Sequence, residues 1–507
     1  MSGYPRPRTV LPYPLAGLAQ QLGVPAPAGD VRLTGVTHAS GSVRPGDLYA
    51  ALPGARRHGA EFVAEAARAG ALAVLTDRTG AAAAAAAGLP ALVVDDPRAA
   101  LGGVAAQVYG DPTARLTVLG ITGTAGKTST AYLIDSGLRA AGVLPGVIGT
   151  VETRLGDERI DSVRTTPEAP DLQALYAVAL ERGIGTVTME VSSHALALGR
   201  VEGTRFAVGG FTNLGVDHLD FHADLAEYFT AKAALFDGRC AHEVVNLDDP
   251  AGRKLVKPET ITVSAAGDPA ATWRAGRITS AGFSQTFDIT GPPGALPAGG
   301  PAGTRFEGSL AMPGAHNVGN ALIALASLVA IGIDPQTALH GIAACRGVPG
   351  RMELVDAPGP VRGVVDYAHK PDAVVAVLAA LREVTDGTLI CVIGAGGDRD
   401  RGKRPLMGEA AARHADLVLV TDDNPRDEDP AAVRAEVLAG AGGPAQVVEV
   451  AGRRTAIDEA VRRARPGDTI AVLGKGHEQG QEVAGEVHPF DDRIELAASL
   501  TERFAAR

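Results

Sequence analysis

Short apolar runs alternate with helical stretches along most of this chain, and that alternation constrains the fold more than any other feature. Before residue 346, runs that predict strands lie at 71–77, 90–96, 115–123, 185–193, 209–215 and 240–249. After it, the same pattern continues through VRGVVDYAH, GTLICVIGAGGD, ADLVLVTDDNPR, AQVVEVAG and DTIAVLGKGHE. Repeated strand–helix alternation is typical of α/β domains built on parallel sheets.

The length of the chain indicates how many such domains to expect. At roughly 100 to 200 residues per domain, 507 residues predict about three. We expect an N-terminal domain of residues 1–115, a central domain of residues 116–345 and a C-terminal domain of residues 346–507. The alanine run at 81–88 and the stretch at 316–333 predict helices, and the Pro/Gly-rich segment 290–303 predicts a flexible hairpin loop.

Composition narrows the classes of partner. The chain has 47 Lys and Arg against 58 Asp and Glu, a net charge of −11 without a basic run, which argues against a nucleic-acid surface. No apolar stretch reaches the roughly 18 residues of a membrane span, and the N-terminal MSGYPRPRTVLPYPLAGLAQ lacks the apolar region of a secretory signal. Three widely spaced cysteines fit neither a disulfide framework nor a zinc site. We expect a cytoplasmic monomer that binds small molecules.

The sharpest local motif is GITGTAGKTST at 120–130, between a predicted strand and a predicted helix. Glycines let backbone N–H groups surround phosphates at a helix N-terminus. Lys127 would then reach the outer phosphates and the Thr128 hydroxyl would bind Mg²⁺. The spacing departs from the usual phosphate-loop motif, because Ile121 stands where the first glycine is expected. We interpret the motif as a nucleotide phosphate loop, against the alternative of a chance glycine-rich turn.

Two further segments place polar groups after apolar strands. TMEVSSHAL (188–196) puts Glu190 where it could bind Mg²⁺ beside the phosphate loop, although a helix cap by Ser192 or Ser193 is an equally good interpretation. TNLGVDHLDFH (212–222) gathers Asp217, His218, Asp220 and His222, which suit a metal or phosphate site or a solvated surface.

Lysine is scarce in this chain. Only seven lysines occur, because arginine supplies most of the positive charge. Lys232 lies within the apolar helical stretch EYFTAKAALF (227–236). Its ordinary interpretation is a side chain that extends to solvent. Its retention favours amine chemistry instead, since burial tunes an amine more readily than a guanidinium.

Four polar loops follow predicted strands in the last third of the chain. They are DYAHKPDAV, GAGGDRDRGKRP, TDDNPRDEDP and LGKGHEQGQE. Ligands of open α/β sheets bind at the carboxyl ends of strands. A basic cluster of Arg399, Arg401, Lys403, Arg404 and Arg426 is expected there, in which Arg426 could clamp a carboxylate with two N–H groups. Glu478 could bind an amine, so an amino acid is the predicted ligand; surface salt bridges are the competing interpretation.

With these motifs in place, nearly the whole chain resembles the Mur ligases, the ATP-dependent amide-forming enzymes of peptidoglycan precursor synthesis. The resemblance covers the phosphate loop, MEVSSHAL, TNLGVDHLDFH, the Lys232 helix, HNVGNALIA, GRME, DYAHKPD, GGDRDRGKRP, DNPR and GKGHE. Within the family it is most similar to ligases that add diaminopimelate to UDP-N-acetylmuramoyl-L-alanyl-D-glutamate. The DNPR motif carries that distinction, since lysine-adding relatives lack its arginine.

The resemblance implies an α/β fold of three domains, with a central phosphate-loop domain and a Rossmann-like C-terminal domain. It implies ATP and Mg²⁺, with Lys127, Lys232 and His218 as catalytic residues and Lys232 as a carbamate. The implied ATP contacts are Gly123, Thr124, Ala125, Gly126, Lys127, Thr128, Ser129, Asn317, Asn320, Arg351, Asp366 and His369. The implied Mg²⁺ ligands are Thr128, Glu190, His218 and Lys232.

The same resemblance implies two sets of substrate contacts. Those to the UDP-muramoyl dipeptide are Ser40, Thr165, Thr166, Ser192 and Arg200, and those to diaminopimelate are Arg399, Asp423, Asn424, Pro425, Arg426, Gly474 and Glu478. The chain departs from the family at three places near the first set. His38-Ala39-Ser40 replaces a usual Asp-Ser-Arg, Arg164 stands where Asn is common, and Leu198 replaces a frequent Gln.

The implied reaction transfers the γ-phosphate of ATP to the glutamate carboxylate, and the amine of diaminopimelate then displaces phosphate from the acyl phosphate. Because the amine and ATP bind different domains, domain closure is expected. Three alternatives remain at this point: a lysine-adding ligase, a folylpolyglutamate-synthase-like ligase, and an ATPase or nucleotide-gated binding protein without ligase activity. The sequence does not distinguish meso- from LL-diaminopimelate.

Overall fold

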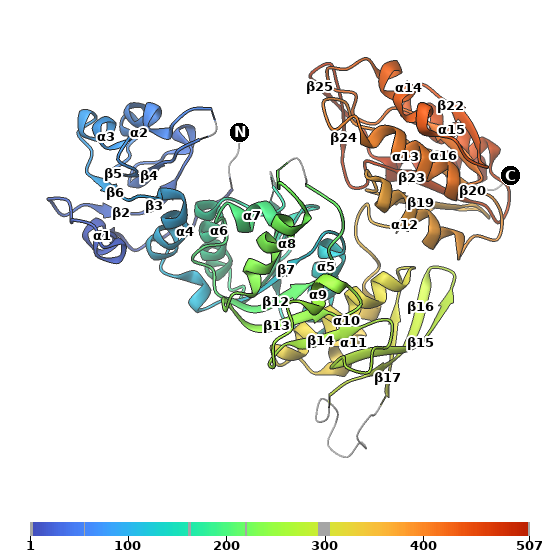
Figure 1. The fold of residues 1–507 in the computed structure, drawn as a ribbon, viewed down its shortest axis with the longest axis horizontal. Helices are drawn as coiled ribbons and strands as arrows, with labels where there is room; N and C mark the ends of the chain where they lie inside the picture. The colour runs from blue at the N-terminus through green and yellow to red at the C-terminus, as the bar shows by residue number, and fades with distance from the viewer. Residues whose placement is uncertain (1–3, 55, 161–163, 219–220, 293–304, 505–507) are drawn as a thin grey trace. The chain divides into compact units, whose positions relative to one another are not determined.

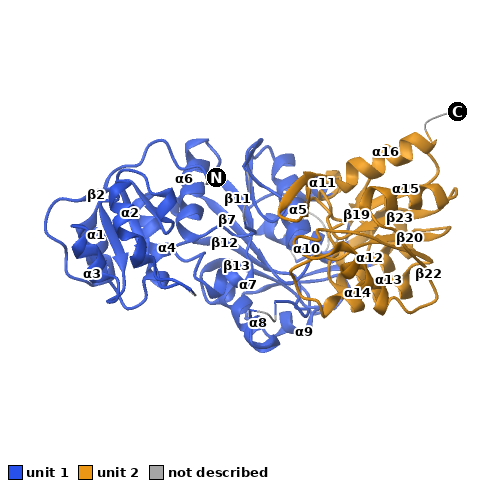
Figure 2. Cartoon of the chain, turned by 90° about the horizontal axis from the view of Figure 1, so that it is seen from above, with its two compact units in different colours: residues 1–276, 289–306, 318–342 blue, residues 277–288, 307–317, 343–507 orange. Residues whose placement is uncertain are grey.

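The computed structural model describes residues 4–54, 56–160, 164–218, 221–292 and 305–504 (Figure 1). The chain forms two compact units. One contains residues 1–276, 289–306 and 318–342, and the other contains residues 277–288, 307–317 and 343–507 (Figure 2).

The N-terminal part of the first unit is built on a parallel sheet ordered β3 (Gly35–Thr37), β4 (Asp47–Ala51), β5 (Ala73–Thr76) and β6 (Ala91–Val93). A short ribbon pairs β1 (Tyr13–Pro14) with β2 (Arg32–Leu33). The helices here are α1 (Leu15–Leu22), η1 (Ser40–Ser42), η2 (Gly59–Phe62), α2 (Val63–Arg68), α3 (Ala81–Ala86) and α4 (Pro97–Val108). Because strand side chains alternate between faces, Leu48 and Leu75 join one core, and Tyr49 and Val74 join the other.

The large sheet has the order β10-β9-β8-β11-β7-β12-β13-β14-β15-β16-β17. Its strands are β7 (Thr117–Thr122), β8 (Pro145–Ile148), β9 (Thr153–Leu155), β10 (Glu158–Ile160), β11 (Thr186–Glu190), β12 (Phe206–Phe211), β13 (Cys240–Asn246), β14 (Ile261–Ser264), β15 (Trp273–Ala281), β16 (Ser284–Thr290) and β17 (Arg305–Leu310). From β8 to β15 every pairing is parallel, whereas β9 runs antiparallel to β8 and β10. Parallel neighbours end at one sheet edge, so β7, β11 and β12 deliver their loops to the same place.

Helices follow most strands of the large sheet. They are η3 (Pro112–Ala114), α5 (Lys127–Ala140), α6 (Ala169–Glu181), α7 (Ser193–Ala197), α8 (Leu225–Ala233), η4 (Ala234–Phe236), α9 (Pro250–Arg253), α10 (Ala315–Ala330) and α11 (Pro335–Ala344). The core between the sheet and α6 contains Leu172, Leu175 and Tyr176, packed among strand residues such as Val187 and Met189.

The sheet of the second unit has the order β18-β19-β23-β20-β21-β22. Its strands are β18 (Glu353–Leu354), which is antiparallel to β19, and the parallel strands β19 (Arg362–Asp366), β20 (Leu389–Ile393), β21 (Leu417–Val420), β22 (Gln446–Glu449) and β23 (Thr469–Leu473). The helices are α12 (Pro371–Arg382), α13 (Lys403–His414), α14 (Pro430–Gly440), α15 (Arg453–Arg463) and α16 (Asp492–Phe504), and a hairpin joins β24 (Gly480–Val483) to β25 (Glu486–Pro489). Cores on both faces of this sheet make it a doubly covered α/β layer.

The predicted parallel α/β architecture is confirmed, with differences in detail. The predicted strand at 209–215 begins earlier, at Phe206, and ends at Phe211, because Thr212–Gly215 turn away to hydrogen-bond the phosphate loop. The short ribbons β9–β10 and β24–β25 were not predicted, since their polar sequences carry little apolar alternation. Most of the predicted loop at 290–303 lies outside the described residues.

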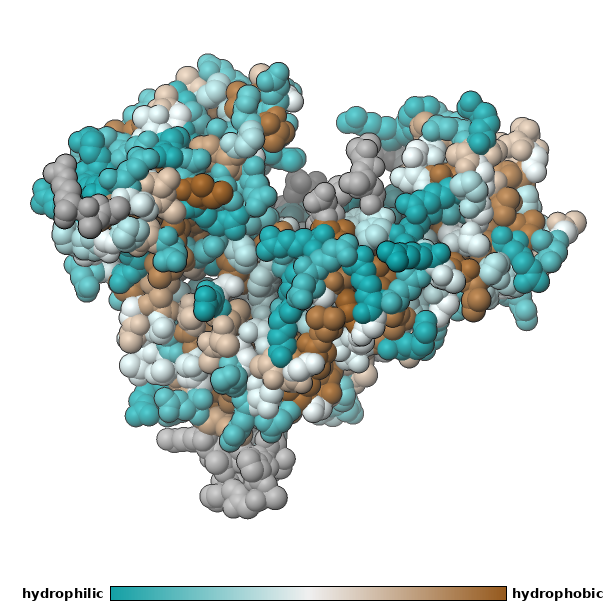
Figure 3. All heavy atoms as spheres, turned by 180° about the vertical axis from the view of Figure 1, so that it is seen from behind, coloured by the Kyte–Doolittle hydropathy of each residue, from teal (hydrophilic) through white to brown (hydrophobic). Residues whose placement is uncertain are grey.

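Within the described residues, no helix is long and apolar enough to cross a membrane. Figure 3 shows hydrophilic residues spread over much of the visible face, with hydrophobic residues in smaller groups between them.

Candidate active site

The phosphate loop connects β7 to α5 as predicted, and two glycines give it its shape. Gly123 has φ 147° and Gly126 has φ 85°, both in the region that favours glycine. A Cβ on Gly123 would lie 1.8 Å from Thr212 Oγ1, and one on Gly126 would lie 2.5 Å from Asn320 Oδ1. The loop therefore fits only glycine at these positions, and it brings Asn320 of α10 to its edge.

Residues after β12 hold the middle of the loop. Ala125 N donates to Asn213 Oδ1 at 2.9 Å, and Thr212 Oγ1 donates to Ala125 O at 2.6 Å. Thr124 Oγ1 lies 3.2 Å from the Tyr228 hydroxyl of α8. Ser129 lies in the first turn of α5, which begins at Lys127. The loop is thus fixed from both sides before any nucleotide binds.

Two lysines converge on one carbonyl of this loop. Lys127 Nζ donates to Gly123 O at 2.7 Å and to Thr124 O at 3.0 Å, and Lys232 Nζ donates to the same Gly123 O at 2.9 Å. Lys232 is 1% exposed, and its amine lies 4.3 Å from the centre of the Tyr228 ring. The interpretation that Lys232 extends to solvent is therefore wrong: the amine is buried beside the phosphate loop.

Glu190, at the end of β11, connects several of the predicted site residues through hydrogen bonds. This carboxylate is 1% exposed. Its Oε1 accepts from Thr128 Oγ1 at 3.0 Å and from Thr150 N at 2.8 Å, and its Oε2 accepts from Thr150 Oγ1 at 3.1 Å. Thr150 Oγ1 lies in turn 3.0 Å from Thr165 Oγ1. The structure thus brings Thr128, Glu190 and Thr165 into one chain of hydrogen bonds.

Three more residues predicted to bind the muramoyl dipeptide lie next to Glu190. Thr166 Oγ1 donates to Glu190 O at 2.9 Å and to Ser192 Oγ at 3.4 Å. Ser192 Oγ also caps α7 by accepting from Ala195 N at 3.2 Å. The helix cap is therefore confirmed, and the contact of Ser192 with the dipeptide stays a prediction. Arg200 NH1 donates to Thr166 O at 3.4 Å. Ser40 instead begins η1, a short 3-10 helix between β3 and β4.

Three arginines surround one buried carboxylate beside these residues. Glu168 lies 2.9 Å from Arg200 Nε, 3.2 Å from Arg164 NH1 and 3.6 Å from Arg98 NH1. Asp171 adds a second carboxylate nearby, so three guanidinium groups face two negative charges, and the remaining positive charge favours an anion. Burial lowers the pKa of the nearby His38, while Glu168 acts in the opposite direction.

The histidine segment packs as a ring cluster. His218 Nε2 lies 3.3 Å from Asp217 Oδ2, and its ring centre lies 4.7 Å from that of His194. His222 is buried, with Nε2 3.1 Å from Ser193 Oγ. His218 has φ 54°, a left-handed conformation that costs a non-glycine residue free energy. Asp220 lies outside the described residues.

The donor set near the loop fits Mg²⁺. This ion prefers oxygen ligands and usually takes one or two carboxylates, water and substrate phosphates rather than a full protein cage. The Thr128 hydroxyl and the Glu190 carboxylate, 3.0 Å apart, supply such oxygens. Among the described residues there is no group of three His, Cys, Asp or Glu side chains placed to hold a metal.

In the second unit, several predicted nucleotide residues gather after β19. Burial raises the pKa of Asp366, whose Oδ2 accepts from Met352 N at 2.7 Å. The Arg351 guanidinium lies 4.6 Å from the Tyr367 ring centre, and the His369 ring lies 4.5 Å from it on centres. Burial lowers the pKa of His369 to about 4. Asn317 of α10 is buried and donates to Pro313 O at 2.8 Å.

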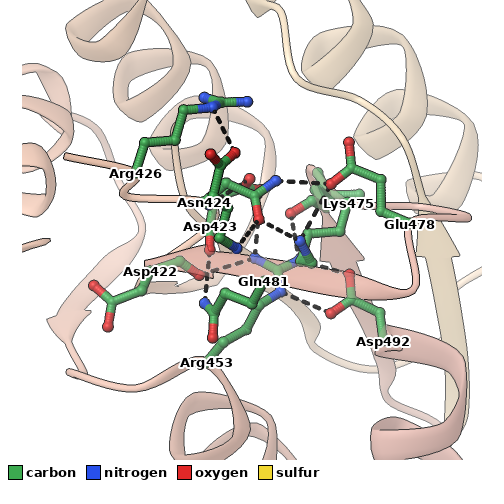
Figure 4. Close-up of polar contacts among 11 residues, drawn as sticks. Asp422, Asp423, Asn424, Arg426, Arg453, Lys475, Glu478, Gln481 and Asp492 are labelled. Carbon is green, nitrogen blue, oxygen red and sulfur yellow. Dashed lines mark hydrogen bonds and ion pairs between the residues drawn. The ribbon is translucent and has the colours of Figure 1, made fainter. Parts of the chain in front are cut away.

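The predicted amino-acid residues meet at the carboxyl ends of β20, β21 and β23 (Figure 4). Asn424 Nδ2 donates to Glu478 Oε2 at 2.8 Å, and Lys475 Nζ donates to Asn424 Oδ1 at 2.9 Å. Gly474 has φ 117°, and a Cβ there would lie 2.4 Å from Asp423 Oδ2. The two loops after β21 and β23 therefore touch through side chains that the sequence had singled out.

Arg426 stands at the rim of this group. Its Nε lies 3.2 Å from Glu482 Oε2, and its NH1 donates to Gly397 O at 2.6 Å. A Cβ on Gly396 would lie 3.0 Å from Arg426 NH1 and 3.9 Å from Arg399 Cγ, and one on Gly397 would lie 1.8 Å from Pro425 O. Arg426 itself has φ 55°, so the backbone is strained where the side chain is presented.

The predicted basic cluster is wrong for two of its arginines. The Arg404 side chain is fully buried, donating to Glu428 Oε1 at 2.7 Å and to Glu436 Oε2 at 2.8 Å. Arg401 Nη2 pairs with the same two carboxylates at 3.3 Å and 2.7 Å. These acids come from α14 and the segment before it, so their pairing with 401–404 could not be seen in the sequence.

Sequence reasoning missed Thr150, the ring of arginines at Glu168, and the buried Arg453 and Asp492 beneath the amino-acid loops. Thr150 and Glu168 lie outside any recognisable motif. Lys475, one of the seven lysines, lies in the LGKGHEQGQE loop that the sequence did indicate.

Comparison with known proteins finds matches along most of the chain. Family models match three segments: "Mur ligase family, catalytic domain" at 32–109, "Mur ligase middle domain" at 121–328, and "Mur ligase, glutamate ligase domain" at 350–476. A Streptomyces coelicolor protein named UDP-N-acetylmuramoyl-L-alanyl-D-glutamate–2,6-diaminopimelate ligase is 55% identical, over 98% of each chain.

Solved structures show the same similarity. One named for the same 2,6-diaminopimelate ligase has a TM-score of 0.70 and 29% identity, covering 97% of this chain and 99% of its own. The fold is also that of the MurF ligase from Thermotoga maritima in complex with ADP, with a TM-score of 0.60 and 18% identity, covering 92% of this chain and 98% of its own. On these matches and on the phosphate loop described above, this chain belongs to the Mur ligase family.

Proposed function

We propose that this chain is the ligase that joins 2,6-diaminopimelate to the D-glutamate carboxylate of UDP-N-acetylmuramoyl-L-alanyl-D-glutamate, with ATP as the energy source. The observation that carries the proposal is the loop pair of the second unit. It holds Arg426, which suits a carboxylate, and Glu478, which suits an ammonium group, around the fixed amide of Asn424. An amino acid with a second charged end fits that combination.

ATP use rests on the phosphate loop. Backbone N–H groups at the start of α5 would bind the phosphates, and Lys127 would move from the loop carbonyls to the outer phosphates. The terminal phosphate would then pass to the glutamate carboxylate and give an acyl phosphate plus ADP. Because several negative charges meet in this step, fixed positive groups are its main catalytic requirement.

Mg²⁺ would be held by Thr128 and Glu190, with His218 as a further predicted ligand. When bound, the ion would neutralise phosphate charge. Thr150, through two hydrogen bonds to Glu190, keeps that carboxylate directed at Thr128.

Lys232 is proposed to act as a carbamate. The ammonium group would lose one proton, and the neutral amine would then add to CO₂, form an N–C bond and release a second proton, so that an anionic carbamate replaces a cation. Its position favours this, because two ammonium groups that share Gly123 O repel each other. Burial against Tyr228 would keep the modified group beside the phosphate loop.

The dipeptide substrate is proposed to lie along Thr165, Thr166, Ser192 and Arg200, close to Glu190. The surplus charge of Arg98, Arg164 and Arg200 suits its anionic groups. Arg164, a departure from the family, would add a cation where relatives commonly have an amide. Ser40 would contact the uridine end.

The nucleotide is proposed to use Asn317, Asn320, Arg351, Asp366 and His369 as well. The flat faces of Tyr367, His369 and Arg351 suit a purine ring.

We also propose that the chain is divided into three functional domains, residues 1–115, 116–345 and 346–507. We propose in addition that it is located in the cytoplasm and acts as a monomer. In the last step of the proposed reaction, the amine of diaminopimelate, bound by residues 346–507, attacks the acyl phosphate, and phosphate leaves.

Phosphate release tests the proposal. The chain is incubated with ATP, Mg²⁺ and the UDP-linked dipeptide, with diaminopimelate, L-lysine or no amino acid. Release that depends on both the dipeptide and diaminopimelate is expected. Release that ignores the amino acid would favour a simple ATPase, and equal rates with lysine would discard the role given to Arg426.

A further inference from the structure

A buried ion pair lies directly beneath the amino-acid loops. Arg453 begins α15 and Asp492 begins α16, and both side chains are fully buried. Arg453 Nε and NH2 donate to Asp492 Oδ1 and Oδ2, each at 2.7 Å, in a two-pronged contact (Figure 4).

The same guanidinium reaches both loops that carry the predicted amino-acid contacts. NH2 donates to Leu473 O at 2.9 Å, at the end of β23, just before Gly474. NH1 donates to Asp422 O at 3.3 Å and lies 3.8 Å from Asp423 Oδ2, in the loop after β21. One side chain therefore contacts the origin of each loop.

The sheet sets the spacing of the strands but forms no direct bond between the two loops. In the strand order β23-β20-β21, the strand β20 separates the two, so no ladder hydrogen bonds join β21 to β23. Farther from the sheet, Lys475 Nζ donates to Asn424 Oδ1, and backbone hydrogen bonds join Arg426 to Glu482 and Ala484. Arg453 is the buried link at the point where both loops leave the sheet.

The chemistry of the link requires arginine. Arg453 uses N–H groups on all three of its nitrogens, toward one carboxylate and two carbonyls that lie in different directions. A lysine has a single donor atom and cannot span these acceptors. A buried ion pair adds little net stability compared with apolar packing, so its hydrogen bonds to the loops are the stronger reason for its presence.

We propose that Arg453, oriented by Asp492, is a positioning residue that sets the spacing between the Asp423–Arg426 loop and the Gly474–Glu478 loop. The inference rests on the proposed function and deepens it. The pair would determine how well the two charged ends of diaminopimelate are matched, without contacting that substrate.

Two conservative variants of the full chain test this. Arg453→Lys keeps the charge and loses the fork, and Asp492→Glu keeps the carboxylate and moves it by one methylene. We expect the KM for diaminopimelate to rise about tenfold or more in each, while the KM values for ATP and the UDP-linked dipeptide change less than about twofold. A merely structural role would shift the unfolding temperature without this separation of KM values.

Arg454→Lys is the matched control. Arg454 is next along α15 and pairs with Glu495 of α16, so it links the same two helices but contacts neither loop. The control should leave all three KM values unchanged. An unchanged KM for diaminopimelate in both folded variants, an equal rise in the control, or failure of both variants to fold would overturn the inference. If the wild-type chain does not ligate diaminopimelate, the proposed function fails with it.

Discussion

Replacing Arg426 by alanine removes the group proposed to hold the distal carboxylate of diaminopimelate. Arg426 already uses Nε toward Glu482 and one N–H of NH1 toward Gly397 O. Of the five guanidinium N–H groups, three therefore remain for a ligand. That is enough for two hydrogen bonds to one carboxylate.

The magnitude follows from that count. A hydrogen bond to a charged group contributes about 1.5–3 kcal/mol. Two such bonds are not fully additive, so we take a loss of about 3 kcal/mol, which corresponds to roughly a 150-fold fall in kcat/KM for diaminopimelate. Alanine keeps the left-handed backbone at φ 55° about as strained as arginine does, so the loop itself should change little.

Initial rates with varied diaminopimelate, at saturating ATP and dipeptide, provide the assay. L-lysine lacks the distal carboxylate, so the preference of the enzyme for diaminopimelate over lysine should collapse in Arg426→Ala. Arg401→Ala is the matched control, because this 63% exposed side chain pairs only with Glu428 and Glu436 among the contacts described above. The reasoning is refuted if Arg426→Ala keeps the wild-type preference, or if its KM for ATP rises in parallel.

Three further predictions concern other parts of the molecule. Lys232→Ala should be inactive and partly restored by added short carboxylates in a phosphate-release assay, and full activity without them would rule out the carbamate. Arg404→Ala should lower the thermal unfolding midpoint, because it removes the buried guanidinium that pairs with the Glu428 and Glu436 carboxylates; an unchanged midpoint would contradict this. Burial lowers the pKa of His369 from an ordinary 6.5 to about 4 in the folded chain. Between these two values the unfolded chain holds a proton on His369 that must be released on folding. Stability should therefore be complete above about pH 6.5 and fall by roughly 2 kcal/mol between pH 7 and pH 5, and His369→Asn should show a smaller fall in unfolding midpoint over that range; equal acid sensitivity of both proteins would exclude the assignment.

Local sequence patterns were sufficient for the features that depend on local physics. The β7–loop–α5 unit was predictable because its glycines, lysine and following helix are contiguous, and the strands of both parallel sheets carry apolar runs that end in polar loops. The placement of Asp423, Asn424, Gly474 and Glu478 in one group followed from a general rule, since the carboxyl ends of parallel strands share an edge.

The features that escaped prediction depend on contacts between distant parts of the chain. Arg404 was predicted to belong to a ligand-binding cluster, but it pairs with Glu428 and Glu436 instead. This pairing requires α13 to pack beside α14. The burial of Lys232 required knowing that α8 lies against the phosphate loop. No sequence motif marks Arg453 and Asp492, because only the fold brings the starts of α15 and α16 together.

The most direct measurement is the mass of the nucleotide product formed with ATP, Mg²⁺ and UDP-N-acetylmuramoyl-L-alanyl-D-glutamate, with meso-diaminopimelate, LL-diaminopimelate and L-lysine offered separately. We predict a product heavier by one diaminopimelate residue, with none formed from lysine, and the stereoisomer that is consumed identifies the substrate. An unchanged nucleotide mass with every amino acid, while ATP is hydrolysed, would contradict the account.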